Sequence, residues 1–234
     1  MRNILSIFAL WLLALVPALA QSTTETRKLA SFQAIEVSNG IELNLTAGPA
    51  QRVEATAETA ELLARLKTEV RNGVLVVSFE REQSEQFGRK SSVRNLRVEV
   101  SAPVISKLDG SSGAQLTVPG PYATDKLAVD LSSGASLVAD FRAAALYLDL
   151  TSGSVATLTG QVEMLQVHVT SGGVFKGRTL QVATCEAAAT SGGNIAVNVQ
   201  KNLVASATSG GGISYSGSPN VSKSTSSGGS VRSR

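Results

Sequence analysis

Residues 146–153 read Leu-Tyr-Leu-Asp-Leu-Thr-Ser-Gly, and residues 165–172 read Leu-Gln-Val-His-Val-Thr-Ser-Gly. In both stretches apolar residues alternate with polar ones, which is typical of a β-strand with one buried face. A Thr-Ser-Gly tripeptide follows each time, and serine and glycine favour turns. The two stretches are therefore copies of one unit, a strand followed by a turn.

The Ser/Thr-Ser-Gly tripeptide occurs seven times, at spacings of 18 to 21 residues, and begins at positions 111, 132, 151, 170, 190, 208 and 226. A fixed period of this kind indicates a repeat architecture. Apolar residues also follow each tripeptide, as Leu137 and Ala139 do, and a third apolar residue such as Phe141 comes later. We therefore predict three short sides per repeat, which make a coil and not a hairpin.

Coils of about 19 residues predict an all-β fold, a right-handed parallel β-helix (solenoid). Equivalent strands would stack in parallel about 4.8 Å apart, and parallel crossovers are right-handed. We expect Gly153 and Gly172 to hold positive φ at one corner of the coil, whereas a change at Ser154, just outside the tripeptide, should be mild. Propeller blades need about 40–45 residues, and leucine-rich repeats need a pattern that is missing here.

The N-terminus has the pattern of an export signal. Arg2 precedes an apolar run, and Ala18-Leu19-Ala20 fits a cleavage site, so residues 1–20 are predicted to be a signal peptide. The mature chain would begin at Gln21, with a flexible N-terminus over residues 21–30. No later segment is apolar enough to predict a membrane-spanning helix.

Residues 31–104 lack the regular tripeptide, and we predict a β-rich part that is continuous with the solenoid and caps its first coil. Regular coils are predicted over residues 105–234. Ser38-Asn39-Gly40 fits either an early coil or a tight hairpin. The remaining expectations are a helix over 57–64, an Asn72-Gly73 hairpin between 66–71 and 74–80, a mobile loop over 81–92 and a strand over 93–101.

In order and spacing, Ser38-Asn39-Gly40-Ile41-Glu42, Leu62-Leu63, Asn72-Gly73-Val74-Leu75 and the Ser-Gly coils resemble the bacterial head GIN domain family. The resemblance runs from about Phe32 to the end of the chain. Glu42 departs from it, because the family's name implies Asn after Gly-Ile. The resemblance implies an exported protein similar to the heads of auto-transporter adhesins, a family without an established biochemical role.

Composition excludes several classes of protein. Charged residues make up 17% of the chain and the net charge is only +3, which argues against strongly charged disorder. No basic run is interleaved with aromatic residues, so we predict no nucleic-acid partner. Cys185 is the only cysteine, so no intrachain disulfide can form, and its place in an apolar column predicts a buried structural thiol.

One outward position, two residues before the tripeptide, forms a column that we call the polar ladder: Asp109, Asp130, Asp149 and His168. Stacked carboxylates could bind a divalent cation or a polysaccharide, or form a solvated polar face. We favour the solvated face, because hard cations need six or more oxygen ligands and only one column is visible. The most patterned surface, which we call the ladder face, is a candidate partner-binding surface of five residues: Asp130, Tyr147, Asp149, Gln166 and His168.

The sequence predicts no catalytic, metal-binding or cofactor-binding residues, since His168 is the only histidine and no phosphate loop is present. We therefore predict a non-catalytic exported protein of the cell envelope or surface, located in the periplasm, on the outer surface or secreted. Its role would be adhesion or scaffolding, with a glycan or an envelope protein as partner.

Two alternatives stay open. A carbohydrate-active β-helix enzyme, a polysaccharide lyase or hydrolase, would need a cleft with paired carboxylates and usually aromatic platforms. The short, even coils offer no long insertion for a cleft, and the only tryptophan, Trp11, lies in the predicted signal peptide.

The other alternative is a polymer of copies stacked end to end. It is disfavoured by three charged residues of the last coil: Lys223, Arg232 and Arg234.

Overall fold

The computed structural model describes residues 22–81 and 95–234 of the chain. The predicted signal peptide, and nearly all of the predicted loop over 81–92, lie outside the described residues. The elements in chain order are β1 (Thr23–Arg27), β2 (Ala34–Val37), β3 (Glu42–Ala47), β4 (Arg52–Ala57), α1 (Ala60–Arg65), β5 (Leu66–Arg71), β6 (Val74–Phe79), β7 (Arg97–Ala102), β8 (Lys107–Gly110), β9 (Gln115–Leu131), β10 (Ser136–Leu150), β11 (Val155–Val169), β12 (Val174–Ala189), β13 (Asn194–Ala207), β14 (Gly212–Ser216), β15 (Asn220–Thr225) and β16 (Ser230–Ser233).

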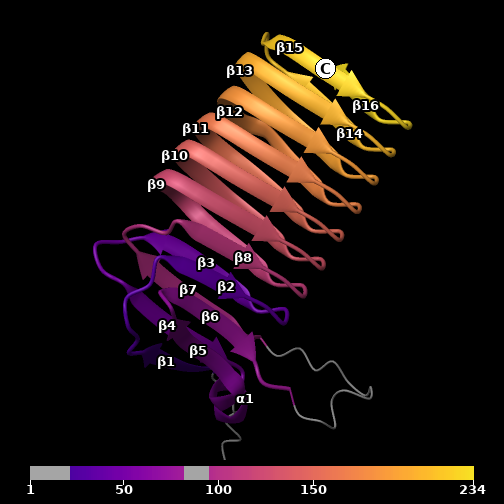
Figure 1. Cartoon of the computed structure of the whole chain (residues 1–234). Helices are drawn as coiled ribbons and strands as arrows, with labels where there is room; N and C mark the ends of the chain where they lie inside the picture. Colours follow the sequence, from indigo (N-terminus) through magenta and orange to yellow (C-terminus); the bar gives the residue numbers. More distant parts are fainter. Residues whose placement is uncertain (1–21, 82–94) are drawn as a thin grey trace, which may run out of the picture.

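The C-terminal half is a stack of parallel coils, as Figure 1 shows. Strands β9 to β13 pair in chain order, and equivalent residues of the repeat face one another, so Leu146 lies opposite Leu127 on one side and Leu165 on the other. The predicted β-solenoid is therefore confirmed. The repeat period sets the register, because a slip of one residue would turn every apolar side chain outward.

Each coil turns sharply at the tripeptide. Ser152 and Gly153 have φ of 52° and 74°, and the Ser154 N–H donates to Thr151 O at 3.1 Å, which is a type I′ turn. The Gly153 N–H also donates to Ser171 O of the next coil at 3.1 Å. The prediction of positive φ at Gly153 and Gly172 is confirmed, and the ladder of backbone bonds between turns ties neighbouring coils together.

The three short sides predicted for each coil are not separate strands. In β10 the chain runs from Ser136 to Leu150 without a break, and only the Ser-Gly turn interrupts the strand. The coil bends within the strand: Ala144 and Ala145 both face outward, so the alternation slips there, and the register shifts between Ala139 and Asp140. Because neighbouring coils bend at corresponding places, most of the hydrogen-bond ladder continues through the bends.

The position after each of the seven Ser/Thr-Ser-Gly turns is filled by alanine, serine or glycine. Ser154 there is fully buried, and its hydroxyl donates to Leu131 O at 3.0 Å. A Cβ added to the equivalent Gly193 would lie 2.3 Å from Val169 O. The expectation that any change at Ser154 is mild is therefore wrong, since a side chain larger than serine would meet the backbone of the preceding coil.

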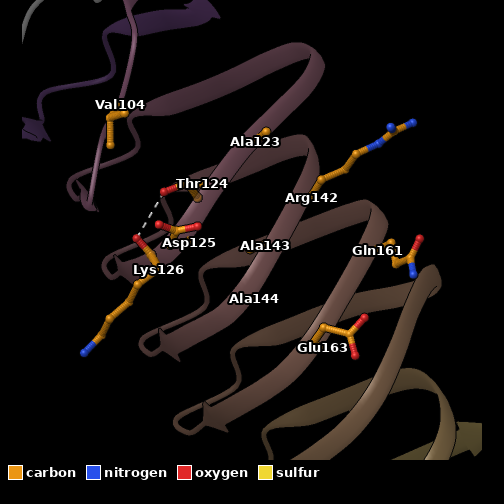
Figure 2. A pocket seen from close by; sticks show the side chains of 10 residues that line it. All are labelled: Val104, Ala123, Thr124, Asp125, Lys126, Arg142, Ala143, Ala144, Gln161 and Glu163. Carbon is orange, nitrogen blue, oxygen red and sulfur yellow. Dashed lines mark hydrogen bonds between the residues drawn. The ribbon is translucent and has the colours of Figure 1, made fainter.

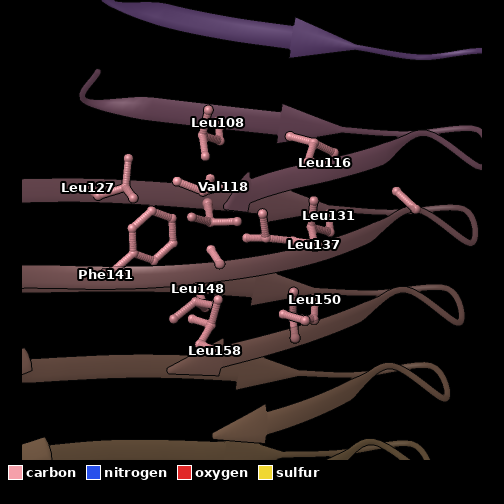
Figure 3. Packing of buried hydrophobic residues seen from close by; sticks show 14 of the residues in the cluster. Leu108, Leu116, Val118, Leu127, Leu131, Leu137, Phe141, Leu148, Leu150 and Leu158 are labelled. Atoms are coloured by element: carbon pink, nitrogen blue, oxygen red, sulfur yellow. The ribbon is translucent and has the colours of Figure 1, made fainter. Parts of the chain in front are cut away.

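The apolar columns form one continuous core inside the coils, and Figure 3 shows part of it. Tyr122, Phe141 and Phe175 are among its largest side chains, each at most 1% exposed. Cys185 is a free thiol in this core, as predicted, and burial together with nearby Glu186 raises its pKa to about 12. A thiol of this kind is inert near neutral pH.

The N-terminal half follows most of the predicted local structure. Asn72 and Gly73 both have positive φ between antiparallel β5 and β6, which confirms the hairpin, and α1 confirms the helix with Thr59 as its N-cap. The turn at Ser38-Asn39-Gly40 belongs to a coil, because the Gly40 N–H donates to Ser112 O at 3.0 Å, as in the later turns.

The expected flexible N-terminus is wrong for residues 23–27, which form β1. This strand pairs antiparallel with β4 over five residues, and Thr24 Oγ1 lies 2.8 Å from Thr56 Oγ1 across the pair. Three threonines in five residues favour an extended strand, because β-branched side chains fit a pleated sheet. Strand β1 thus covers the outer edge of β4.

Candidate functional site

The polar ladder forms one column of the sheet. Asp109 of β8, Asp130 of β9, Asp149 of β10 and His168 of β11 lie opposite one another in successive coils. Glu36 of β2 continues the column on the other side of Asp109. The column arises because each residue stands two positions before a Ser-Gly turn, and the turns stack in register.

Lys107 neutralises the acidic end of this column. Its ammonium lies 2.8 Å from Asp130 Oδ2 and 3.8 Å from Asp109 Oδ2. The hydrogen bond with Asp130 raises the pKa of Lys107, while partial burial, opposed by Lys107, raises the pKa of Asp109. The lysine occupies the space between the carboxylates, which is where a bound cation would have to lie.

The five residues of the ladder face share one side of β9 to β11. Tyr147 and Gln166 are opposite each other in the next outward column, and His168 Nδ1 lies 3.6 Å from Asp149 Oδ2. The Lys126 ammonium stands 4.9 Å from the centre of the Tyr147 ring. Asp149 and His168 remain about half exposed, at 57% and 47%, so the surface is accessible, flat and polar.

Nothing in the described ranges, 22–81 and 95–234, gathers three His, Cys, Asp or Glu side chains closely enough to hold a metal ion. Within the same ranges no helix is long and apolar enough to span a membrane.

A hollow of about 740 Å³ lies at the bend of the coils (Figure 2). Its floor is apolar and includes Ala143 and Ala144 of β10, and we call it the bend groove. Six side chains with polar ends stand around this floor: Thr124, Asp125, Lys126, Arg142, Gln161 and Glu163. In Figure 2 Lys126 and Arg142 extend in opposite directions from the bend.

The groove exists because one coil carries shorter side chains than the coils on either side of it. Residues 143–145 of β10 are all alanine, and they pair with 124–126 of β9 and 162–164 of β11. This register places Asp125 and Glu163 on either side of Ala144, two coil spacings or about 10 Å apart along the stack. Longer side chains on the outer coils therefore flank a strip of methyl groups.

Sequence reasoning missed the bend groove. It followed the outward residues before the turn, whereas the groove depends on residues at the bend, which carry no turn motif. The run of three alanines between coils with charged residues at the same repeat position was the available signal. It became meaningful only once the bend was known to lie inside a continuous strand.

Similar folds occur in solved structures. A "putative adhesin" from Bacteroides fragilis is 15% identical with a TM-score of 0.81, over 92% of this chain and 97% of that one. A "putative adhesin" from Parabacteroides distasonis is 18% identical with a TM-score of 0.70, over 92% and 98% of the two chains. A "putative lipid binding protein" from the same species is 17% identical with a TM-score of 0.67, over 91% and 96%.

At these identities the likeness establishes the fold, and no curated protein matches the sequence. The family model described as "Putative auto-transporter adhesin, head GIN domain" matches residues 31–219, which include both the irregular N-terminal strands and the Ser-Gly coils. The chain therefore belongs to the head GIN domain family.

Proposed function

We propose that this protein is exported and acts without catalysis, as an adhesion or scaffold protein of the bacterial cell envelope or surface. The family's description and the adhesins of similar fold support an adhesin-like role. The observation that carries the proposal is the ladder face, a flat polar surface held by three stacked strands. Such a surface suits an extended glycan or another envelope protein.

The rigidity of the scaffold favours binding over catalysis. Strands β9 to β11 pair through nearly their whole lengths, so the ladder face cannot close over a substrate. An active site must exclude water and surround the reacting groups, which a flat and exposed surface does not do. The alternative of a polysaccharide lyase or hydrolase has no corresponding feature on this face.

The test is attachment of the purified protein to immobilised envelope fragments of the producing bacterium. The triple variant Asp130→Ala, Asp149→Ala, His168→Ala should fold normally and bind at least about fivefold less, because all three side chains contact solvent. The matched control replaces three exposed cations elsewhere, Lys176, Arg178 and Arg232, by alanine, and should retain attachment.

Unchanged attachment of the ladder-face variant would refute the proposed binding surface. Cleavage of a neutral or acidic polysaccharide by the wild type, lost in that variant, would refute the non-catalytic role. Export is tested separately by N-terminal sequencing of the protein from the envelope fraction. Gln21 is the expected first residue, and retention of Met1 would contradict the signal peptide.

A further inference from the structure

We propose that the bend groove is a second binding site, whose ligand is a segment of a neutral polysaccharide chain. This inference goes beyond the proposed function, because the groove uses the bend of the coils and the ladder face uses the strands before the turns. It rests on the charge balance of the groove, on its shape and on the backbone pairing beneath it.

The charges around the groove balance. Two carboxylates, Asp125 and Glu163, and two cations, Lys126 and Arg142, line the groove, and the Lys126 ammonium stands 4.9 Å from the Tyr147 ring at its border. No ion pair within the described residues engages Asp125, Arg142 or Glu163. A phosphate or anionic headgroup would meet the carboxylates, and a cationic ligand would meet the lysine and arginine. A hydroxyl both donates and accepts hydrogen bonds, so a neutral polyol can use both kinds of group.

A second hollow lies beside the bend groove. It has a volume of about 500 Å³ and is lined by residues without formal charge, among them Gln33, Gln51 and Asn72. Val104, whose exposed fraction is 54%, lines both hollows, so the two are neighbours that share one residue. An elongated site with amide groups at one end and balanced charges at the other fits a neutral chain of several sugar units.

The backbone at the bend argues against a peptide ligand. Extended peptides gain much of their affinity by adding a strand to an open sheet edge. Here Ala143 and Ala145 pair with Thr124 and Lys126 on one side and with β11 on the other, so β10 offers no free edge. The groove presents side-chain donors and acceptors over methyl groups, and these match the hydroxyls and C–H faces of sugars.

The experiment is isothermal titration of the purified protein with four neutral oligosaccharides: cellohexaose, maltohexaose, xylohexaose and mannohexaose. At least one should bind, and its Kd should change less than about twofold between low and high salt, because a neutral ligand releases no counterions. Ala144→Phe should weaken binding at least about tenfold by filling the floor. Ala188→Phe, a half-buried alanine in the column of the polar ladder, is the matched control and should leave the Kd unchanged.

Asp125→Asn keeps the side-chain size and removes the negative charge, and Arg142→Gln removes the guanidinium and leaves a shorter, neutral amide; each should weaken binding about threefold or more. Failure of all four hexaoses to bind would overturn the proposal, as would equal affinity in Ala144→Phe. Binding of phosphatidylglycerol vesicles or of an uncharged extended peptide in their place would overturn it too. The ladder-face variant should bind the hexaose normally, so failure of this site and failure of the proposed adhesive face are separate results.

Discussion

The two halves of the molecule build the same kind of coil by different routes. From β9 to β13 the strands are 14 to 17 residues long, every pair is parallel and spatial order follows chain order. In the N-terminal half the strands are 4 to 6 residues long, and β1–β4, β4–β7 and β5–β6 are antiparallel. There β3 lies between β7 and β9, and β2 between β6 and β8.

The coil made by β2 and β3 is therefore enclosed by strands that come later in the chain. Its polar contacts are correspondingly distant in sequence: Asn44 Nδ2 donates to Glu99 at 2.7 Å, and Arg97 lies 3.0 Å from Glu42. Glu42, the departure from the family pattern, thus has a partner 55 residues away. A repeated turn specifies contacts with the next coil, whereas the N-terminal half depends on long-range pairing, which costs more loop entropy.

The largest expected loss of stability comes from a cavity inside a regular coil. Phe175 is fully buried in β12, and Phe175→Ala should cost about 3–5 kcal/mol. Because each coil contacts mainly its neighbours, the cavity should uncouple β13 to β16 from the rest. Hydrogen exchange should show lost protection in these strands and retained protection in β2 to β7. Equal loss in both halves would mean that the molecule unfolds as one unit.

The second prediction compares what the same strained backbone conformation costs in the two halves. Gly153 in a coil turn and Gly73 in the hairpin have φ of 74° and 76°, and a Cβ meets nothing within 4 Å at either. Valine at either site should therefore cost about 1–3 kcal/mol from strain alone. Asparagine tolerates this backbone region and should cost less at both sites. Unfolding midpoints equal to wild type for Gly153→Val would contradict the role of the turn.

The smallest expected change in stability concerns the junction of the halves. There Asp109 lies between Glu36 and Asp130. Burial raises the pKa of Asp109 above 3.8, so the folded state binds the proton more tightly than the unfolded state. Ionisation of Asp109 therefore reduces stability as the pH rises through 3.8 and the raised pKa. Asp109→Asn should gain stability relative to wild type between pH 3 and pH 7, by less than about 1 kcal/mol because the site is partly exposed.

Thermal unfolding at the two pH values checks this sign. Asp149→Asn is the control for the substitution itself, because Asp149 lies in the same column and is 57% exposed. A relative loss of stability for Asp109→Asn at pH 7 would show that the attraction to Lys107 outweighs the burial of the carboxylate.

The sequence alone determined the regular coils, the Ser-Gly corners, the buried thiol and the Asn72-Gly73 hairpin. These features depend on contacts within a repeat or between adjacent repeats, and a period of about 19 residues records such contacts directly. The column of Asp109, Asp130, Asp149 and His168 followed for the same reason, since residues at one repeat position must stack once the coils do.

Only the tertiary structure decided the order of the N-terminal strands, the burial of Ser154 and the bend groove. Strand order there depends on pairings between distant segments, which leave no period in the sequence. Ser154 is buried because the backbone of the preceding coil passes close to it, a distance that no residue pattern encodes. The groove forms where three alanines meet longer side chains of two other coils, so it belongs to the stacking of coils and not to any one of them.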